Sequence, residues 1–91
     1  MEFIYTPGRI YAEDKRGKLL AEVTFPTVSE NIVEIDHTFV DDSLRGQGIA
    51  GKLMERTAQV LAESGQKAVC SCSYAQAWFA KHPEYDELIQ K

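Results

Sequence analysis

The sequence predicts one mixed α/β (α+β) domain, in which helices pack against a mostly antiparallel sheet, with the element order β-β-β-α-β-α. Three observations support this prediction. Runs of alternating polarity occur up to residue 40, an amphipathic run with helical spacing follows a glycine-rich loop, and a short apolar run precedes a second helical segment. The 91 residues, 44% hydrophobic and 26% charged, suit one globular domain over 1–91 and are too few for two.

The first two strands are expected at 9–13 and 18–25, on either side of a charged turn at 14–17 that ends in glycine. Alternating runs around such a turn are typical of a β-hairpin. A polar connection at 26–31 follows the hairpin and leads into the next strand.

The third strand is expected at 32–40, where apolar residues alternate with polar ones. The side chains expected on its apolar face are Val33, Ile35, His37 and Phe39. Asp36 and Thr38 are then expected on the opposite face, where they could line a cleft.

A helix is expected at 48–64, because apolar residues recur there at helical spacing. The residues on its apolar side are Ile49, Ala50, Leu53, Met54, Thr57, Ala58, Val60 and Leu61. Gly65 follows at the place of a helix C-terminal cap. A fourth strand at 67–72, a helix that Ser73 caps and that runs through residue 81, and a last short helix at 84–89 complete the chain.

The charge of the chain argues against a nucleic-acid partner. Its net charge is −4, and its only basic cluster, at 15–18, falls in the expected hairpin turn. No apolar run approaches the roughly 20 residues needed to cross a membrane, and no secretory signal opens the chain. We therefore expect a cytoplasmic protein without a nucleic-acid or membrane partner.

Two cysteines, Cys70 and Cys72, fall in the fourth expected strand. Their Cα atoms would lie roughly 6.6 Å apart with side chains badly directed for a disulfide. We expect two free thiols, as in a reducing compartment, and no zinc pattern, because His37 and His82 are far from them in the sequence.

The most informative segment runs from a strand through a glycine-rich turn, 41–48, into the amphipathic helix. The first N–H groups of a helix lack partners within it, and glycines let the backbone approach a ligand closely, so this segment suits a pyrophosphate. Residues 46–51 match the dinucleotide string G-x-G-x-x-G, but three strands precede them and the chain is too short for a dinucleotide fold. The P-loop string is absent, since Gly51-Lys52 is followed by Leu53.

The string Arg45-Gly46-Gln47-Gly48-Ile49-Ala50 resembles motif A, [RQ]-x-x-G-x-[GA], of the GNAT superfamily of N-acetyltransferases. The order of elements is also similar to the core of that family. Segments 36–40, 44–53, 72–74 and 81–85 further resemble small GNAT-like proteins of the YjdJ type. Cys70 departs from that pattern, because the family often has proline there.

This resemblance implies a minimal GNAT-like fold that binds acetyl-CoA and transfers the acetyl group to an unidentified amine, without a metal. The residues implied in coenzyme binding are Phe39, Val40, Arg45, Gly46, Gln47, Gly48, Ile49, Ala50 and Gly51. Backbone N–H groups of 45–50 would hold the pyrophosphate, and Phe39 and Val40 would pair with the pantetheine arm. The N-terminal helices that help to form the acceptor pocket in longer members are missing. The acceptor site is then either open, which suits a protein acceptor, or completed by a partner chain.

Cys72 and His37 are the candidate catalytic residues. Cys72 is expected just before a helix N-terminus, which stabilises a thiolate, and the family that it resembles carries a proposed active-site cysteine here. It could carry the acetyl group or protonate the leaving thiolate, or it could simply fill space in the core. His37 could act as a general base, or it could be a core residue on an apolar face.

Other polar and aromatic residues near these candidates have simpler interpretations. Tyr74 could donate its phenol proton or pack at a helix start, and Trp78 and Phe79 are expected in the core. Asp41 and Asp42 are expected to serve the hydrogen bonds of the turn or to face solvent. Two other functions remain open, a non-catalytic acetyl-CoA module or sensor and a small protein–protein interaction domain.

Overall fold

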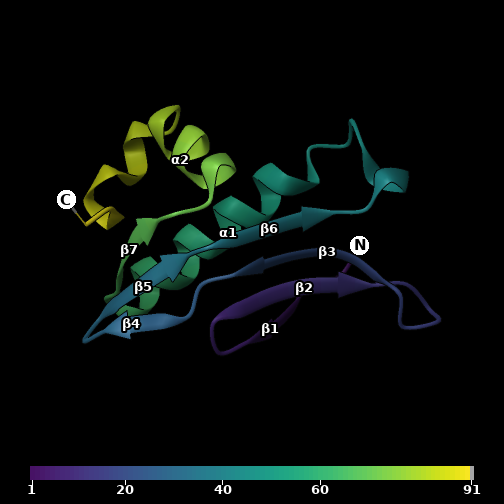
Figure 1. Cartoon of the computed structure of the whole chain (residues 1–91), viewed down its shortest axis with the longest axis horizontal. Coiled ribbons are helices and arrows are strands. Elements are labelled where there is room, and N and C mark those ends of the chain that lie inside the picture. The colour runs from purple at the N-terminus through teal and green to yellow at the C-terminus, as the bar shows by residue number, and fades with distance from the viewer. Residues whose placement is uncertain (91) are drawn as a thin grey trace.

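The computed structural model describes residues 1–90, whose strands form two sheets (Figure 1). The first sheet has the strand order β1-β2-β3-β6 and the second has the order β4-β5-β7. The strands are β1 (Ile4–Thr6), β2 (Arg9–Glu13), β3 (Leu19–Thr24), β4 (Thr27–Ser29), β5 (Ile32–Ile35), β6 (His37–Val40) and β7 (Lys67–Cys70). The helices are α1 (Ile49–Ser64) and α2 (Ser73–Ala80), with 3₁₀ turns η1 (Asp42–Leu44) and η2 (Pro83–Leu88).

The predicted hairpin is confirmed as the antiparallel pair β2 and β3. Its turn is held by the carboxylate of Asp14, which accepts the backbone N–H groups of Arg16 and Lys18 at 2.8 and 2.9 Å. One face of the pair is fully buried and consists of Ile10, Ala12, Ala21 and Val23. The other face carries polar side chains that include Arg9 and Glu22, so the alternation in the sequence identified the buried face correctly.

The predicted third strand is two strands, β5 and β6, which belong to different sheets. Asp36 lies between them, and its N–H donates to the carbonyl of Thr24 at 3.2 Å. Val33 and Ile35 before it are buried as expected. The chain passes from one sheet to the other at Asp36, which ends the alternation of β5.

The alternation therefore restarts one position later in β6. Thr38 and Val40 are half-buried, while His37 and Phe39 are exposed. The prediction that His37 and Phe39 share the face of Val33 and Ile35 is wrong, because it treated Asp36 as an ordinary strand residue.

Two strands were not predicted. β1 and β4 are three residues long and fully exposed, and each pairs antiparallel with one neighbour, β1 with β2 and β4 with β5. β4 lies within the segment 26–31, which was expected to be a connection only. Short exposed strands lack the alternation that identifies a half-buried strand.

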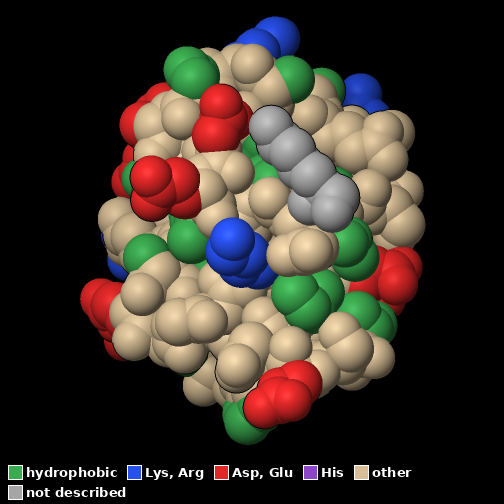
Figure 2. Space-filling view, turned by 90° about the vertical axis from the view of Figure 1, so that its left-hand side faces the viewer, with side chains coloured by type: hydrophobic (Ala, Val, Ile, Leu, Met, Phe, Trp, Pro, Cys, Tyr) green, Lys and Arg blue, Asp and Glu red, His purple; other side chains and the backbone are tan. Residues whose placement is uncertain are grey.

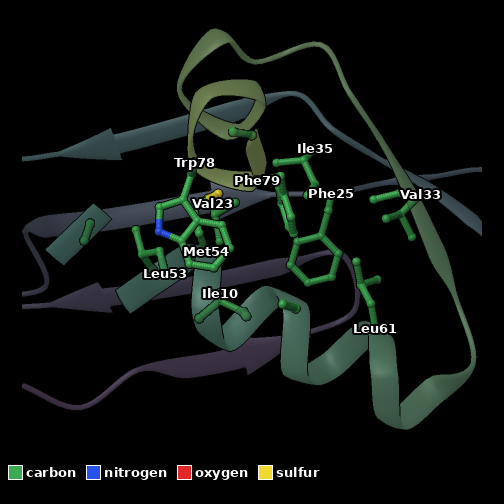
Figure 3. Packing of buried hydrophobic residues seen from close by; sticks show 14 of the residues in the cluster. Ile10, Val23, Phe25, Val33, Ile35, Leu53, Met54, Leu61, Trp78 and Phe79 are labelled. Carbon is green, nitrogen blue, oxygen red and sulfur yellow. The ribbon is translucent and has the colours of Figure 1, made fainter. Parts of the chain in front are cut away.

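Helix α1 packs its apolar side on the first sheet, as its spacing predicted. Its buried residues are Ile49, Leu53, Met54, Thr57, Ala58 and Leu61. They meet Phe25, Ile35, Trp78 and Phe79 in one hydrophobic cluster (Figure 3). Gly65 caps the helix with φ of 72°, which confirms the predicted stop. No helix within residues 1–90 is long and apolar enough to span a bilayer.

The second helix begins differently from the prediction. Its N-cap is Cys72, not Ser73, and no side chain caps it. The short helix expected at 84–89 is the 3₁₀ helix η2, with Pro83 at its first position.

The two sheets separate where β6 and β7 diverge, and these strands are the outer members of their sheets. β5 and β7 are parallel partners as far as Ile35, whose carbonyl accepts the N–H groups of Ser71 and Cys72, both at 3.1 Å. Beyond this point β6 pairs with β3, while the chain after β7 turns into α2 (Figure 1). Thr38, Val40 and Cys72 therefore flank the point of separation.

Candidate active site

The loop between β6 and α1 exposes an array of backbone donors. Gly46 and Gly48 have φ of 80° and 71°, a conformation that other residues rarely adopt, and open space surrounds both Cα atoms. No backbone acceptor within residues 1–90 pairs with the N–H groups of Gly46, Gly48, Ile49, Ala50 and Gly51. Five free donors at the positive end of a 16-residue helix form a site for an anion.

These donors border a hollow of about 200 Å³, which is lined by the loop, the first turn of α1, Val40 and Tyr74. A larger hollow of about 470 Å³ lies beside β7 and includes Cys70, Phe79, Asp86 and Ile89. Among residues 1–90, Asp86 is the only charged residue that lines the larger hollow, and a carboxylate does not suit a pyrophosphate. On the face of Figure 2, hydrophobic side chains appear in small separate areas among acidic ones.

The acidic residues before the loop have structural roles, as predicted. Asp41 caps η1 by accepting the N–H of Ser43 at 3.1 Å, and hydrogen bonds from the hydroxyl and N–H of Ser43 lower the pKa of the Asp41 carboxyl. Asp42 is exposed and pairs with Arg45, with 3.0 Å between Oδ1 and Nε. An exposed pair of this kind contributes about 0–1 kcal/mol, so Arg45 can leave Asp42 for a phosphate at little cost.

Phe39 and Val40 occupy different surroundings, although both were predicted to bind the coenzyme. β6 pairs with β3 along one edge, and no strand within residues 1–90 pairs with its other edge. Val40 faces the hollow, while the Phe39 side chain is 37% exposed on the opposite face. Pairing of Phe39 with pantetheine would therefore involve its backbone, as the prediction supposes.

Cys72 lies at the N-terminus of α2, opposite β6 across the separation of the sheets. Its Sγ is 3.5 Å from the Thr38 hydroxyl oxygen. Burial raises the pKa of the Cys72 thiol, but the Thr38 hydroxyl and the nearby N–H groups of Ala75 and Tyr74 at the start of α2 outweigh it, and the resulting pKa is below the usual value. Burial and the neighbouring Cys72 raise the pKa of Cys70, and both cysteines are free thiols, as predicted.

Thr38 is the residue of this site that sequence reasoning did not connect with Cys72. It was expected opposite the apolar residues of the third strand, where it could line a cleft, and it does face the separation of the sheets, but its contact with Cys72 was not predicted. No local pattern pairs residues that are 34 positions apart.

We expect Thr38→Val to move the alkylation of Cys72 by iodoacetamide to higher pH. The thiolate is the reactive form, and the valine removes a hydrogen-bond donor that stabilises it while keeping nearly the same shape. The rate of Cys72 carbamidomethylation is followed against pH by peptide mass spectrometry. Thr38→Ser, which keeps the hydroxyl, should restore the original profile. An unchanged profile in the valine variant would show that the hydroxyl does not stabilise the thiolate.

His37 lies on the face of β6 opposite Thr38 and Val40, and its side chain is 51% exposed. Its Nε2 is 3.3 Å from a carboxylate oxygen of Glu22, which also binds Arg9. Thr38, the next residue, faces Cys72, so the structure does not bring His37 and Cys72 together. A catalytic role for His37 stays a prediction.

Tyr74 lines the hollow and is 40% exposed. Burial raises the pKa of its phenol, so the group stays protonated at neutral pH but is a weaker acid than an ordinary tyrosine. Trp78 and Phe79 are buried with 8% and 5% exposure, which confirms their predicted place in the core.

Comparison with known proteins identifies the family of this chain. A family described as GCN5-related N-acetyl-transferase matches residues 9–88. The chain belongs to this family. The predicted resemblance to the GNAT superfamily is thereby confirmed, whereas the finer resemblance to the YjdJ type stays a prediction.

Individual relatives of this GCN5-related N-acetyltransferase agree with the family match. Protein NATD1 of Mus musculus is 33% identical over 72 residues, which are 77% of this chain and 66% of the mouse protein. Protein NATD1 of Homo sapiens is also 33% identical, and 64% of it is covered. The chain thus spans slightly less than two thirds of the length of these relatives.

Solved structures confirm the mixed α+β fold. The solution structure of a GCN5-like protein from Staphylococcus aureus has a TM-score of 0.82 and 32% identity, over 98% of this chain and 87% of that one. An acetyltransferase of the GNAT family from the same species has a TM-score of 0.65 and 15% identity, over 81% of this chain and 50% of that one. The second protein shows the shared fold alone, in a chain with room for further elements.

Proposed function

We propose that this chain binds acetyl-CoA and transfers its acetyl group to an amine. The observation that carries the proposal is the array of five free N–H donors at residues 46 and 48–51, which suits a pyrophosphate. The unpaired edge of β6 gives the pantetheine arm a backbone to pair with. Arg45 supplies a cation for phosphate oxygens.

The proposed reaction begins when the lone pair of a neutral amine attacks the thioester carbonyl carbon. A backbone N–H on the free edge of β6 stabilises the oxyanion of the tetrahedral intermediate. The nitrogen gives up its extra proton to solvent, the C–S bond breaks, the amide remains, and the coenzyme thiolate takes a proton. The Tyr74 phenol, which lines the hollow, or the Cys72 thiol would supply that proton.

A second route passes through Cys72, and its lowered pKa favours it. The Cys72 thiolate attacks the carbonyl, coenzyme A leaves as a thiolate that takes a proton, and an acetyl-cysteine remains. A neutral amine then attacks this new thioester, receives the acetyl group, loses its extra proton to solvent and releases the Cys72 thiolate. In the thiolate form, Sγ would accept a hydrogen bond from the Thr38 hydroxyl, which lies 3.5 Å away at the separation of the sheets.

A base role for His37 requires the acceptor to approach from the face of β6 opposite Thr38 and Val40. Glu22 binds one ring nitrogen of His37, which leaves the other free to take a proton from an ammonium group. An exposed side chain suits an acceptor that brings its own surface, such as a protein, or a partner chain that completes the pocket. His37→Gln should then lower the transfer rate without changing acetyl-CoA affinity.

Intact-mass spectrometry tests the proposed transfer. The protein is incubated with acetyl-CoA, alone and with a panel of amines and lysine peptides, while release of coenzyme A is followed with a thiol reagent. Acetylated acceptor together with released coenzyme A supports transfer, and a stable gain of one acetyl group on the protein favours the Cys72 route. Binding with neither product would leave a non-catalytic module or sensor.

A further inference from the structure

Trp78 is a core residue whose indole nitrogen has no hydrogen-bond partner within residues 1–90. Its ring is held in place by neighbours in the core. It stacks on His82, with ring centroids 3.7 Å apart and planes 12° apart, and meets Phe79 edge-on at 5.0 Å. The direction of the indole N–H is therefore fixed by packing of the ring and not by a hydrogen bond.

The indole nitrogen is directed at the first turn of α1. It lies 3.5 Å from the position that a Cβ on Gly51 would occupy, and the Tyr74 hydroxyl lies 3.8 Å from the same point. In Figure 3 the nitrogen is on the edge of the ring that is turned away from Phe79 and Phe25. No fully buried polar side-chain atom of residues 1–90 lacks a partner, so this N–H still reaches solvent where it meets Gly51.

Gly51 has an ordinary helical conformation, so its backbone does not require glycine. A methyl group there would meet the indole nitrogen at ordinary van der Waals distance and would fill the space in front of the N–H. Glycine inside a helix is unfavourable relative to alanine. Its effect here is to leave the indole N–H open toward the free N–H groups of Ala50 and Gly51.

We infer that the Trp78 indole N–H is a direct donor to the bound coenzyme, which makes Trp78 a specificity-determining residue of this site. The Trp78 indole nitrogen and the Tyr74 hydroxyl of α2 lie near the same point beside Gly51 of α1, at the margin of the hollow that Tyr74 and Gly51 line, and donors placed together in this way select an oxygen acceptor. That oxygen belongs either to a phosphate or to an amide carbonyl of the pantetheine arm. The inference rests on the proposed acetyl-CoA site and adds a contact outside the loop to it.

The chain has one tryptophan, so its ¹H–¹⁵N correlation spectrum contains a single indole signal. Titration of the whole protein with acetyl-CoA should shift this signal together with the amides of residues 46–51. ADP and pantetheine, titrated separately, identify the acceptor, because ADP lacks the amide carbonyls and pantetheine lacks the phosphates. A shift with either fragment supports the contact. Loop amides that shift while the indole signal stays fixed would overturn it and leave the proposed function intact, whereas no shift anywhere would overturn both.

Trp78→Phe removes the N–H and keeps an aromatic ring. We expect acetyl-CoA affinity to fall about three- to tenfold if the acceptor is an amide carbonyl, and by more than about tenfold if it is a charged phosphate. Tyr85→Phe is the matched control, because Tyr85 stacks on the same ring at 5.7 Å without reaching Gly51, and it should bind as the original chain does. Equal affinity of both variants and the original chain would overturn the inference.

Gly51→Ala tests the same space without altering the tryptophan, in case Trp78→Phe does not fold. Because the added methyl has room and alanine favours a helix, the midpoint of thermal unfolding should stay or rise. Acetyl-CoA affinity should nevertheless fall, and the indole signal should no longer shift on titration. Full affinity with an unchanged indole shift would contradict a ligand at this position.

Discussion

Gly48→Glu is expected to abolish acetyl-CoA binding, with a loss of affinity of at least about 100-fold, or about 2.7 kcal/mol. The new carboxylate would lie at the N-terminus of α1, beside the free N–H groups that are proposed to bind a phosphate. The carboxylate and the phosphate of the coenzyme would then repel each other. Isothermal titration calorimetry with acetyl-CoA measures the loss.

The substitution also introduces strain, because Gly48 has φ of 71°. Gly17→Glu is the matched control, since Gly17 has φ of 82° and equally open surroundings in the distant hairpin turn. Both variants should lose about 1–2 kcal/mol of unfolding free energy in chemical denaturation. Only Gly48→Glu should lose acetyl-CoA binding. Equal acetyl-CoA affinity of the two variants would contradict a coenzyme site in this loop.

Cys72→Ala is expected to lower the rate of acetyl transfer by about 100-fold or more and to leave acetyl-CoA affinity within about twofold. The groups proposed to donate hydrogen bonds to the coenzyme are backbone N–H groups at 46 and 48–51, in a different segment from Cys72. Removal of Sγ should therefore affect the chemical step and not acetyl-CoA binding. Release of coenzyme A in the presence of an accepted amine measures the rate, and intact mass should show no acetyl gain on the protein.

Cys70→Ala provides the control for Cys72→Ala. Cys70 is two residues away from Cys72. Burial raises the pKa of the Cys70 thiol, whereas the pKa of the Cys72 thiol is lowered, so Cys70 is the less reactive thiol at neutral pH. This variant should transfer at close to the original rate. A Cys72→Ala variant as active as Cys70→Ala would assign the chemistry to direct transfer without the cysteine.

The coenzyme loop and α1 were predictable because their signals are local. Gly46 and Gly48 mark the turn, the apolar spacing of 49–61 marks the buried side of the helix, and Gly65 marks its end. Each of these features depends on residues within a few positions of one another. The structure places all three as the sequence indicated.

The surroundings of the candidate catalytic residues were less predictable. A single polar residue, Asp36, moves the chain from one sheet to the other, and nothing in its local sequence separates it from an ordinary strand position. Misreading that residue placed His37 on the wrong face and concealed the contact between Thr38 and Cys72. The open N–H of Trp78 was equally hidden, since a buried tryptophan at helical spacing indicates only a core residue.

Calorimetric titration of the whole chain with acetyl-CoA tests the central claim most directly. The free N–H groups at 46 and 48–51 predict saturable one-to-one binding, with a dissociation constant between about 1 µM and 1 mM. Heat that saturates at one equivalent, and that disappears in Gly48→Glu but not in Gly17→Glu, is the expected result. No binding with acetyl-CoA at about 1 mM would contradict the coenzyme site and leave a GNAT fold without its ligand.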